Sequence, residues 1–204
     1  MDTQKTRAHI EALWQKDIIA QLHEYIRIPN QSPMFDPKWQ EHGHMEKAVQ
    51  LAFNWVKKQN ITGLHTQILR LPERTPLLYI EIEGQLPGDV LMYGHLDKQP
   101  PFDGWRSEEG LSAWEPVEID GKLYGRGGAD DGYAVFASLA AVSAMQAQHI
   151  DHPRIVIVIE CSEESGSCDL PFYVEEYADK IGNPKLVICR SAFGVVRRCV
   201  SIWL

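Results

Sequence analysis

The 204-residue sequence has no long apolar run, no excess of basic residues and no closely paired cysteines. A membrane-spanning helix needs about 20 consecutive apolar residues, and the polar start, Met1 to Lys5, does not have the apolar core of an export signal. The formal net charge of -8 leaves no basic face for a phosphate backbone, which argues against nucleic acid as a partner. The four cysteines are expected to stay reduced and to pack as small apolar residues. We therefore expect a cytoplasmic globular protein that binds neither membrane nor nucleic acid.

Helix and strand patterns alternate along the chain. Apolar residues at helical spacing predict helices over residues 5–27, 44–58, 132–148 and 169–179. Short apolar runs predict strands over residues 66–71, 77–83, 89–93, 117–119, 154–160 and 185–189. The β-branched run 154–160 is typical of a central strand buried on both faces, and 185–189 is expected to be another buried strand. The alternation predicts an α/β fold with a mostly parallel central sheet flanked by helices, with sites just past the carboxyl ends of the strands.

The first of three acid-bearing segments follows a predicted strand and reads Tyr93-Gly94-His95-Leu96-Asp97. Residues two apart in an extended chain point to the same side, so Asp97 can lie beside His95 and orient its imidazole. Carboxylates do this for metal-bound histidines, which makes His95 a candidate ligand. The tripeptide is not specific by itself, and an exposed turn at a strand end is an alternative interpretation.

The second segment, residues 125–131, combines three glycines with Asp130 and Asp131. Glycines allow a tight turn, and Asp130 lies just before a predicted helix whose N-terminal amides favour a carboxylate. A carboxylate held there can bridge two cations, although a simple N-cap by either aspartate is the common role of such a residue. A dinucleotide-binding loop does not fit, because Asp130 takes the place of the third glycine and would repel a pyrophosphate.

The third segment, residues 162–166, places Glu163 and Glu164 directly after the apolar strand 154–160. Neighbours on an extended chain project in opposite directions, so one glutamate can bind metal while the other faces a water molecule as general base. A solvated acidic turn is the alternative. A serine hydrolase is not indicated, because the Gly-x-Ser-x-Gly pattern is absent.

In their order along the chain and in their residue sequences, these segments resemble those of the co-catalytic di-zinc metallopeptidases. That family includes carnosinase-type dipeptidases, aminoacylase, acetylornithine deacetylase and succinyl-diaminopimelate desuccinylase. The resemblance runs from about residue 15 to Cys189 and includes Asp103-Gly104-Trp105 and the run 120–127 between the first two segments. It implies a zinc-peptidase-like catalytic domain and a mechanism in which two zinc ions polarise the scissile carbonyl of a dipeptide or an N-acyl amino acid.

The resemblance also implies a role for each site residue. Asp130 would bridge the two ions, with His95 as a ligand of one and Glu164 as a ligand of the other. Glu163 would be the general base that takes a proton from water and passes it to the leaving amine. Asp97 would be a second catalytic residue that orients the imidazole. Zn²⁺ is the expected cofactor, Mn²⁺ and Co²⁺ are possible, and the peptide bond between Asp130 and its neighbour Asp131 is expected to be cis.

The tail departs from the resemblance. The family places a further Asp ligand after the strand 185–189 and a His ligand later, but residues 190–204 contain no Asp, Glu or His. We expect residues 1–189 to be the N-terminal part of a metallopeptidase catalytic domain. Residues 190–204 are expected to be an anomalous tail, the product of truncation, of a frame change near residue 190, or of a divergent C-terminus.

The missing Asp and His ligands limit the expected activity. Catalytic zinc normally has three protein ligands, and here each ion would have two, so at most one weakly bound ion and impaired or absent hydrolysis are expected. The family's lid domain, through which members often form homodimers, is also expected to be missing. The alternative is a noncatalytic fragment that acts as a weak metal-binding or interaction module.

Overall fold

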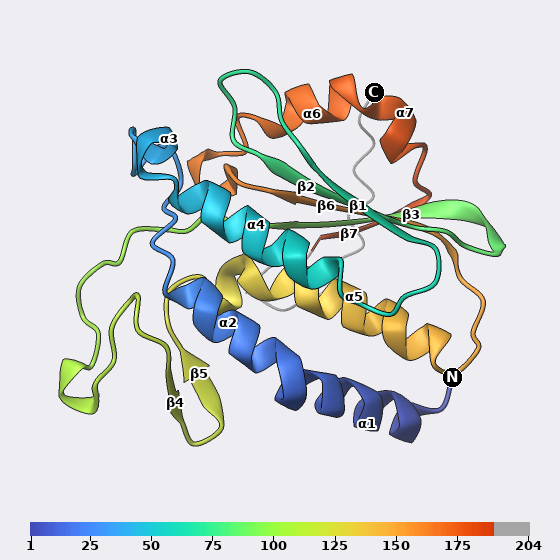
Figure 1. Ribbon diagram of the computed structural model, residues 1–204, viewed down its shortest axis with the longest axis horizontal. Helices are drawn as coiled ribbons and strands as arrows, with labels where there is room; N and C mark the ends of the chain where they lie inside the picture. The colour runs from blue at the N-terminus through green and yellow to red at the C-terminus, as the bar shows by residue number, and fades with distance from the viewer. Residues whose placement is uncertain (190–204) are drawn as a thin grey trace.

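A five-stranded sheet forms the centre of the molecule, which is described for residues 1–189 by a computed structural model (Figure 1). The strand order is β1-β2-β6-β3-β7, with bounds Leu64–Leu69, Leu77–Ile82, Pro153–Glu160, Leu86–His95 and Leu186–Cys189. Strand β3 pairs in parallel with β6 and β7, whereas β2 pairs antiparallel with β1 and β6. Four strands therefore run in one direction and only β2 opposes them, which confirms the mostly parallel sheet.

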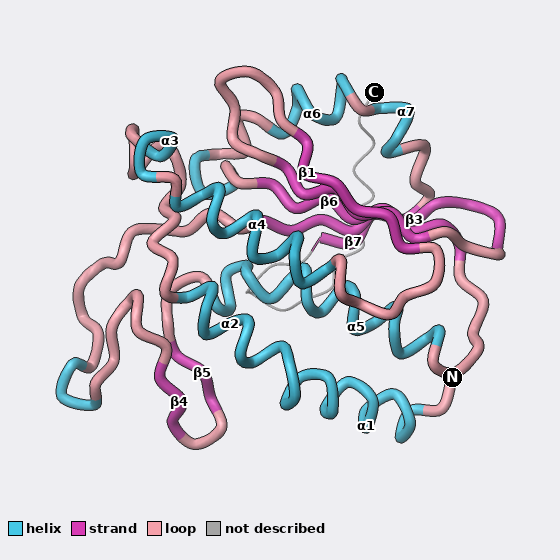
Figure 2. Tube along the Cα trace, in the orientation of Figure 1, coloured by secondary structure: helices cyan, strands magenta, loops and turns pink. Residues whose placement is uncertain are grey.

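Helices cover both faces of this sheet (Figure 2). On one face lie α1 (Thr3–Leu13), α2 (Ile19–Ile26), α4 (His44–Val56) and α5 (Tyr133–Gln146), and on the other lie α6 (Leu170–Glu176) and α7 (Ala178–Ile181). A short α3 (Trp39–His42) precedes α4. The predicted helices and the sheet strands occur close to their expected positions, except that the helix expected over 169–179 is interrupted at Tyr177, whose φ of -111° and ψ of 25° are not helical.

Strand β6 separates two apolar cores. Its Ile155, Ile157 and Ile159 pack with the helices α2, α4 and α5 on one face. Its Val156 and Val158 pack with residues of α6 and α7 on the other face. Alternate residues of a strand point to opposite faces, so the β-branched run is buried on both sides as predicted.

Two details of the fold differ from expectation. Strand β7 lies at the edge of the described sheet and is only half-buried, with Leu186 42% exposed, because it pairs with β3 alone. Among the described cysteines, which form no disulfide with one another, Cys161 is buried as predicted, but Cys168 and Cys189 are exposed. The short strand predicted over 117–119 is present and lies outside the central sheet.

That strand belongs to a separate hairpin, β4 (Val117–Ile119) with β5 (Lys122–Tyr124). The glycine-rich second segment was predicted to follow a strand of the central sheet. It follows β5 of this hairpin instead. The first and third segments do follow such strands, β3 and β6. Within residues 1–189 no helix has both the length and the apolar character needed to cross a membrane.

Candidate metal centre

The candidate site lies at the carboxyl ends of the neighbouring parallel strands β3 and β6. His95 is the last residue of β3 and lies opposite Glu160, the last residue of β6. His95 is 4% exposed and Asp97 is fully buried, which rules out the exposed surface turn considered above. Parallel strands bring residues from distant parts of the chain to one edge of the sheet, which is where ligand sites form in open α/β folds.

Asp97 connects the imidazole to the segment that carries the two glutamates. Its carboxylate accepts the backbone N–H groups of Glu163 at 3.0 Å and Glu164 at 2.9 Å. The same carboxylate lies 3.5 Å from Nδ1 of His95. This Nδ1 atom also lies 3.1 Å from the backbone carbonyl oxygen of Asp97. Asp97 therefore holds one side of the ring and leaves Nε2 directed toward the other acids.

Asp130 approaches this Nε2 from the turn before helix α5. Its Oδ1 lies 3.4 Å from Nε2 of His95, and its side chain is 47% exposed. The peptide bond between Asp130 and Asp131 is cis, as expected. The N-cap of α5 is Gly132, and no side chain of residues 1–189 caps this helix, so neither aspartate has the capping role that was the alternative interpretation.

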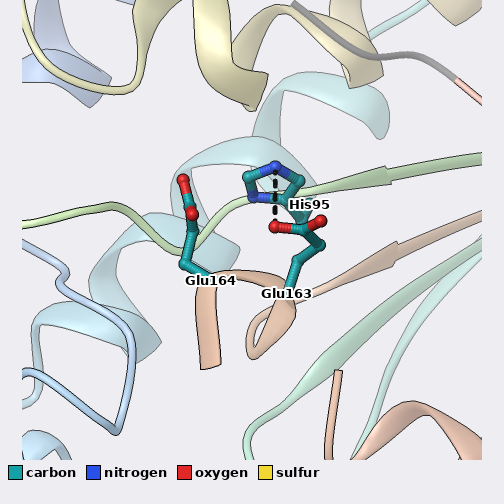
Figure 3. Close-up of side chains that lie close together, drawn as sticks. All are labelled: His95, Glu163 and Glu164. Carbon is teal, nitrogen blue, oxygen red and sulfur yellow. Dashed lines mark ion pairs between the residues drawn. The ribbon is translucent and has the colours of Figure 1, made fainter. Parts of the chain in front are cut away.

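Glu163 and Glu164 complete the cluster from a turn that we call the glutamate turn, residues 162–167 (Figure 3). Nitrogen or oxygen ligand atoms of His95, Glu163 and Glu164 all lie within 4.8 Å of one another. Glu163 Oε2 is 3.7 Å from Nε2 of His95. Glu164 Oε2 accepts a hydrogen bond from Gln99, whereas its Oε1 is buried and has no hydrogen-bond partner among the described residues.

The acids determine the charge state of the imidazole. Burial lowers the pKa of His95, but hydrogen bonding to Asp130 and Asp97 outweighs burial and raises this pKa to about 11. The His95 imidazole in turn lowers the pKa of Asp130, and Arg126 adds to that effect. Burial raises the pKa of Glu164, and the nearby Asp130 charge adds to the rise despite the hydrogen bond from Gln99. The site thus has more negative charge than its surroundings balance and attracts a positive charge.

These residues fit a divalent cation. Imidazole nitrogen and carboxylate oxygen are the donors that zinc accepts, and within residues 1–189 the buried Oε1 of Glu164 is an acceptor without a hydrogen-bond donor. Such an oxygen costs free energy unless a donor or a cation satisfies it. The close group consists of His95, Glu163 and Glu164, with Asp130 beside His95. Both glutamates lie at the site, and their separate roles as metal ligand and general base therefore stay predictions.

Sequence comparison gives the family. The profile of peptidase family M20/M25/M40 matches residues 91–190, which include all three acid-bearing segments. Close to half of the chain is thus similar to this peptidase family. The human protein named Beta-Ala-His dipeptidase is 32% identical over 178 residues, which are 82% of this chain and 34% of that protein. A succinyl-diaminopimelate desuccinylase from Nitrosospira multiformis is 36% identical over 79 residues, 38% of this chain and 20% of the relative.

Solved structures agree with this assignment. Human carnosine dipeptidase 1 is similar with a TM-score of 0.70 and 28% identity over 91% of this chain and 40% of that one. A dipeptidase from Saccharomyces cerevisiae, at 21% identity, shares the fold with a TM-score of 0.73 over 92% of this chain and 40% of that one. The chain thus spans about a third of the human Beta-Ala-His dipeptidase and two fifths of each of these two solved structures.

Two residues of the site were not expected from the sequence. Gln99 lies in the segment 99–121, whose Pro, Gly and Trp content predicts a long loop but no site residue, and it donates a hydrogen bond to Glu164. Glu160 ends the predicted central strand and is 2% exposed. The sequence did contain one indication for Glu160, because it is an acid at the end of an otherwise apolar strand. A buried carboxylate needs hydrogen-bond partners.

Proposed function

We propose that this chain carries part of the metal centre of a hydrolase that cleaves dipeptides or N-acyl amino acids. The observation that carries the proposal is the convergence of one imidazole and three carboxylates, from His95, Asp130, Glu163 and Glu164, at one edge of the sheet. The names of the relatives, a Beta-Ala-His dipeptidase and a succinyl-diaminopimelate desuccinylase, support this substrate class. Zn²⁺ is the proposed ion, and Mn²⁺ and Co²⁺ are alternatives that accept the same donors.

In the proposed division of labour, His95, Asp130 and Glu164 hold metal and Glu163 moves the proton. A bound divalent ion supplies a Lewis acid that polarises the scissile carbonyl and makes water more acidic. Glu163 accepts the proton of the attacking water and returns it to the leaving amine. Its side chain is 40% exposed, so it can reach both water and substrate. Asp97 orients the imidazole and holds the two glutamate amides.

The chain by itself supplies few ligands for two ions. His95 and Asp130 would serve one ion and Glu164 and Asp130 the other, whereas catalytic zinc normally has three protein ligands. The proposal for the 204-residue chain is therefore one weakly held ion and hydrolysis that is impaired or absent. In that case the chain alone would be a weak metal-binding module. The cytoplasmic location of the protein stays a prediction, and so does the formation of homodimers by the complete family members.

A zinc titration against a competing chelator tests the proposal. His95→Ala removes the proposed ligand, and His65→Ala is the matched control, because His65 is exposed and pairs with the exposed Glu83. We expect the unchanged chain and His65→Ala to bind one ion with equal affinity and His95→Ala to bind none. Equal binding by His95→Ala, or no binding by the unchanged chain, would contradict the metal centre.

A further inference from the structure

A second buried carboxylate lies beneath the candidate metal centre and has no role in the proposed chemistry. Glu160 is 2% exposed and accepts three hydroxyl hydrogen bonds. Tyr93 and Ser167 donate to Oε1 at 2.6 and 2.7 Å, and Ser162 donates to Oε2 at 3.0 Å. Both carboxylate oxygens are therefore engaged, and two of the three donors belong to the glutamate turn.

Those two donors are the first and last residues of the turn. Ser162 and Ser167 are also joined by a backbone hydrogen bond of 2.9 Å from the Ser167 N–H to the Ser162 carbonyl, and the same carbonyl accepts the Ser165 N–H at 3.1 Å. Glu160 thus fastens both ends of a closed turn to the end of β6. Ser167 has a φ of 53°, a left-handed conformation that is unfavourable for serine and needs external contacts to persist.

Stability alone does not account for a carboxylate at this position. No ion pair is formed by Glu160 among the described residues, and its hydrogen-bond partners are neutral hydroxyls. Burial raises the pKa of Glu160, and the three hydroxyl hydrogen bonds offset part of that rise. An apolar side chain would end a buried strand at less cost, because a buried polar group is stabilising only when its partners compensate for lost water.

We infer that Glu160 is a positioning residue that fixes the glutamate turn, so that Glu163 and Glu164 face His95. The turn is then held from two sides, by the Asp97 carboxylate on the amides of Glu163 and Glu164 and by Glu160 on the hydroxyls of the terminal serines. This inference rests on the proposed metal centre. Partners that orient metal ligands commonly change metal affinity 10- to 100-fold when they are removed.

Two hydroxyls on one carboxylate oxygen provide a matched pair of variants. Ser167→Ala and Tyr93→Phe each remove one hydrogen bond to Oε1, of 2.7 and 2.6 Å respectively. Only Ser167→Ala releases the turn, because Tyr93 lies on strand β3 and is fixed by the sheet. Alanine has the same backbone preference against a positive φ as serine, so this exchange adds no new backbone strain of its own.

Two measurements on the 204-residue chain test the inference. Zinc affinity is determined by competition with a chelator, and amide hydrogen exchange of Glu163 and Glu164 is followed by NMR in the metal-free chain. We expect Ser167→Ala to weaken zinc binding about tenfold and to speed exchange of both amides at least fivefold relative to amides of strand β2. Tyr93→Phe should leave zinc affinity and relative exchange within about twofold of the unchanged chain.

Glu160→Gln is the direct variant, and its effects on zinc affinity and on relative exchange should exceed those of Ser167→Ala. Glu83→Gln, which alters an exposed carboxylate that pairs with His65, should change neither. If Glu160→Gln does not fold, the Ser167 and Tyr93 pair decides. Equal effects of Ser167→Ala and Tyr93→Phe, or none, would overturn the positioning role. Failure of the unchanged chain to bind zinc would refute the metal centre instead, and the exchange comparison would still decide whether Glu160 holds the turn.

Discussion

The carboxylate of Asp97 accepts the backbone N–H of Glu163 at 3.0 Å, although the two residues are 66 positions apart in the chain. Through this hydrogen bond, the residue that stands beside the His95 imidazole also fixes the position of the proposed base. A change at Asp97 is therefore expected to disturb the imidazole and the glutamate turn together.

Asp97→Asn should weaken zinc binding about 10- to 100-fold. The amide oxygen of Asn can accept one of the two N–H groups of Glu163 and Glu164, but its NH₂ group would face the other donor. One buried donor then lacks a partner, so we expect a loss of about 1–3 kcal/mol in the free energy of unfolding. Urea denaturation and zinc competition measure the two effects, and an unchanged zinc affinity would contradict the orienting role.

Glu163→Gln and Glu164→Ala should separate the base from the ligand. Because the proposed base contacts water and not the ion, Glu163→Gln is expected to leave zinc binding within about threefold, whereas Glu164→Ala should abolish it. In a version extended by the C-terminal part of a dipeptidase relative, both variants should lose hydrolysis of a dipeptide. Equal loss of zinc by the two variants would show that the assigned roles are wrong.

Gly94→Ala should destabilise the site without removing any of its ligands. A Cβ at Gly94 would lie 2.6 Å from the Cβ of Ala134 and 2.9 Å from Oδ2 of Asp131, too close for either contact. Overpacking of this kind typically costs about 1–3 kcal/mol. Gly128→Ala is the milder control, because its Cβ would meet the flexible Ile26 side chain, with Cδ1 at 3.2 Å and Cγ1 at 3.6 Å. Thermal unfolding of both variants measures the difference, and equal melting temperatures would contradict the close packing of β3 on α5.

The Glu81 and Arg154 pair should make stability depend on pH below about 4.5. Burial raises the pKa of Glu81, but hydrogen bonds from Arg154, at 2.6 Å, and from Tyr79 outweigh burial and lower this pKa below 4.5. A lowered folded-state pKa means that the pair stabilises the protein above the unfolded-state value and loses this contribution as the pH falls through the folded-state value.

Glu81→Gln should accordingly cost about 1 kcal/mol at pH 7 and less at pH 3.5, because pH 3.5 lies below the ordinary pKa of a glutamate, where the unfolded chain takes up the proton and the contribution of the pair declines. Urea denaturation of both proteins at the two pH values gives this difference. A cost that does not change with pH would show that Glu81 acts through packing and not through its charge.

Much of the fold could be read from local pattern, because apolar periodicity reports which face of an element is buried. The alternation of β-branched residues in 154–160 predicted a central strand, and β6 separates two apolar cores as such a strand must. The same reasoning failed for 185–189, which has a similar apolar run but lies at the edge of the described sheet. A short run does not contain the information about how many neighbours it will have.

The site was partly predictable for the same reason. Residues just past the ends of parallel strands meet at one edge, so His95 and the glutamates could be placed together before their distances were known. Gln99 and Glu160 could not be assigned, because their roles depend on hydrogen bonds across the fold. The tail expected to be anomalous, residues 190–204, lies outside the described residues.

The sequence by itself determined the element types, the order of the acidic segments and the absence of any Asp, Glu or His after Cys189. These are properties of neighbouring residues, fixed by side-chain chemistry and backbone preference. Only the tertiary structure decided that Asp97 is fully buried, that its carboxylate accepts two glutamate amides, and that Glu160 holds the turn from below. The physical reason is that hydrogen bonds and burial at this centre join β3 to the turn after β6, and such contacts form only when the sheet brings distant parts of the chain together.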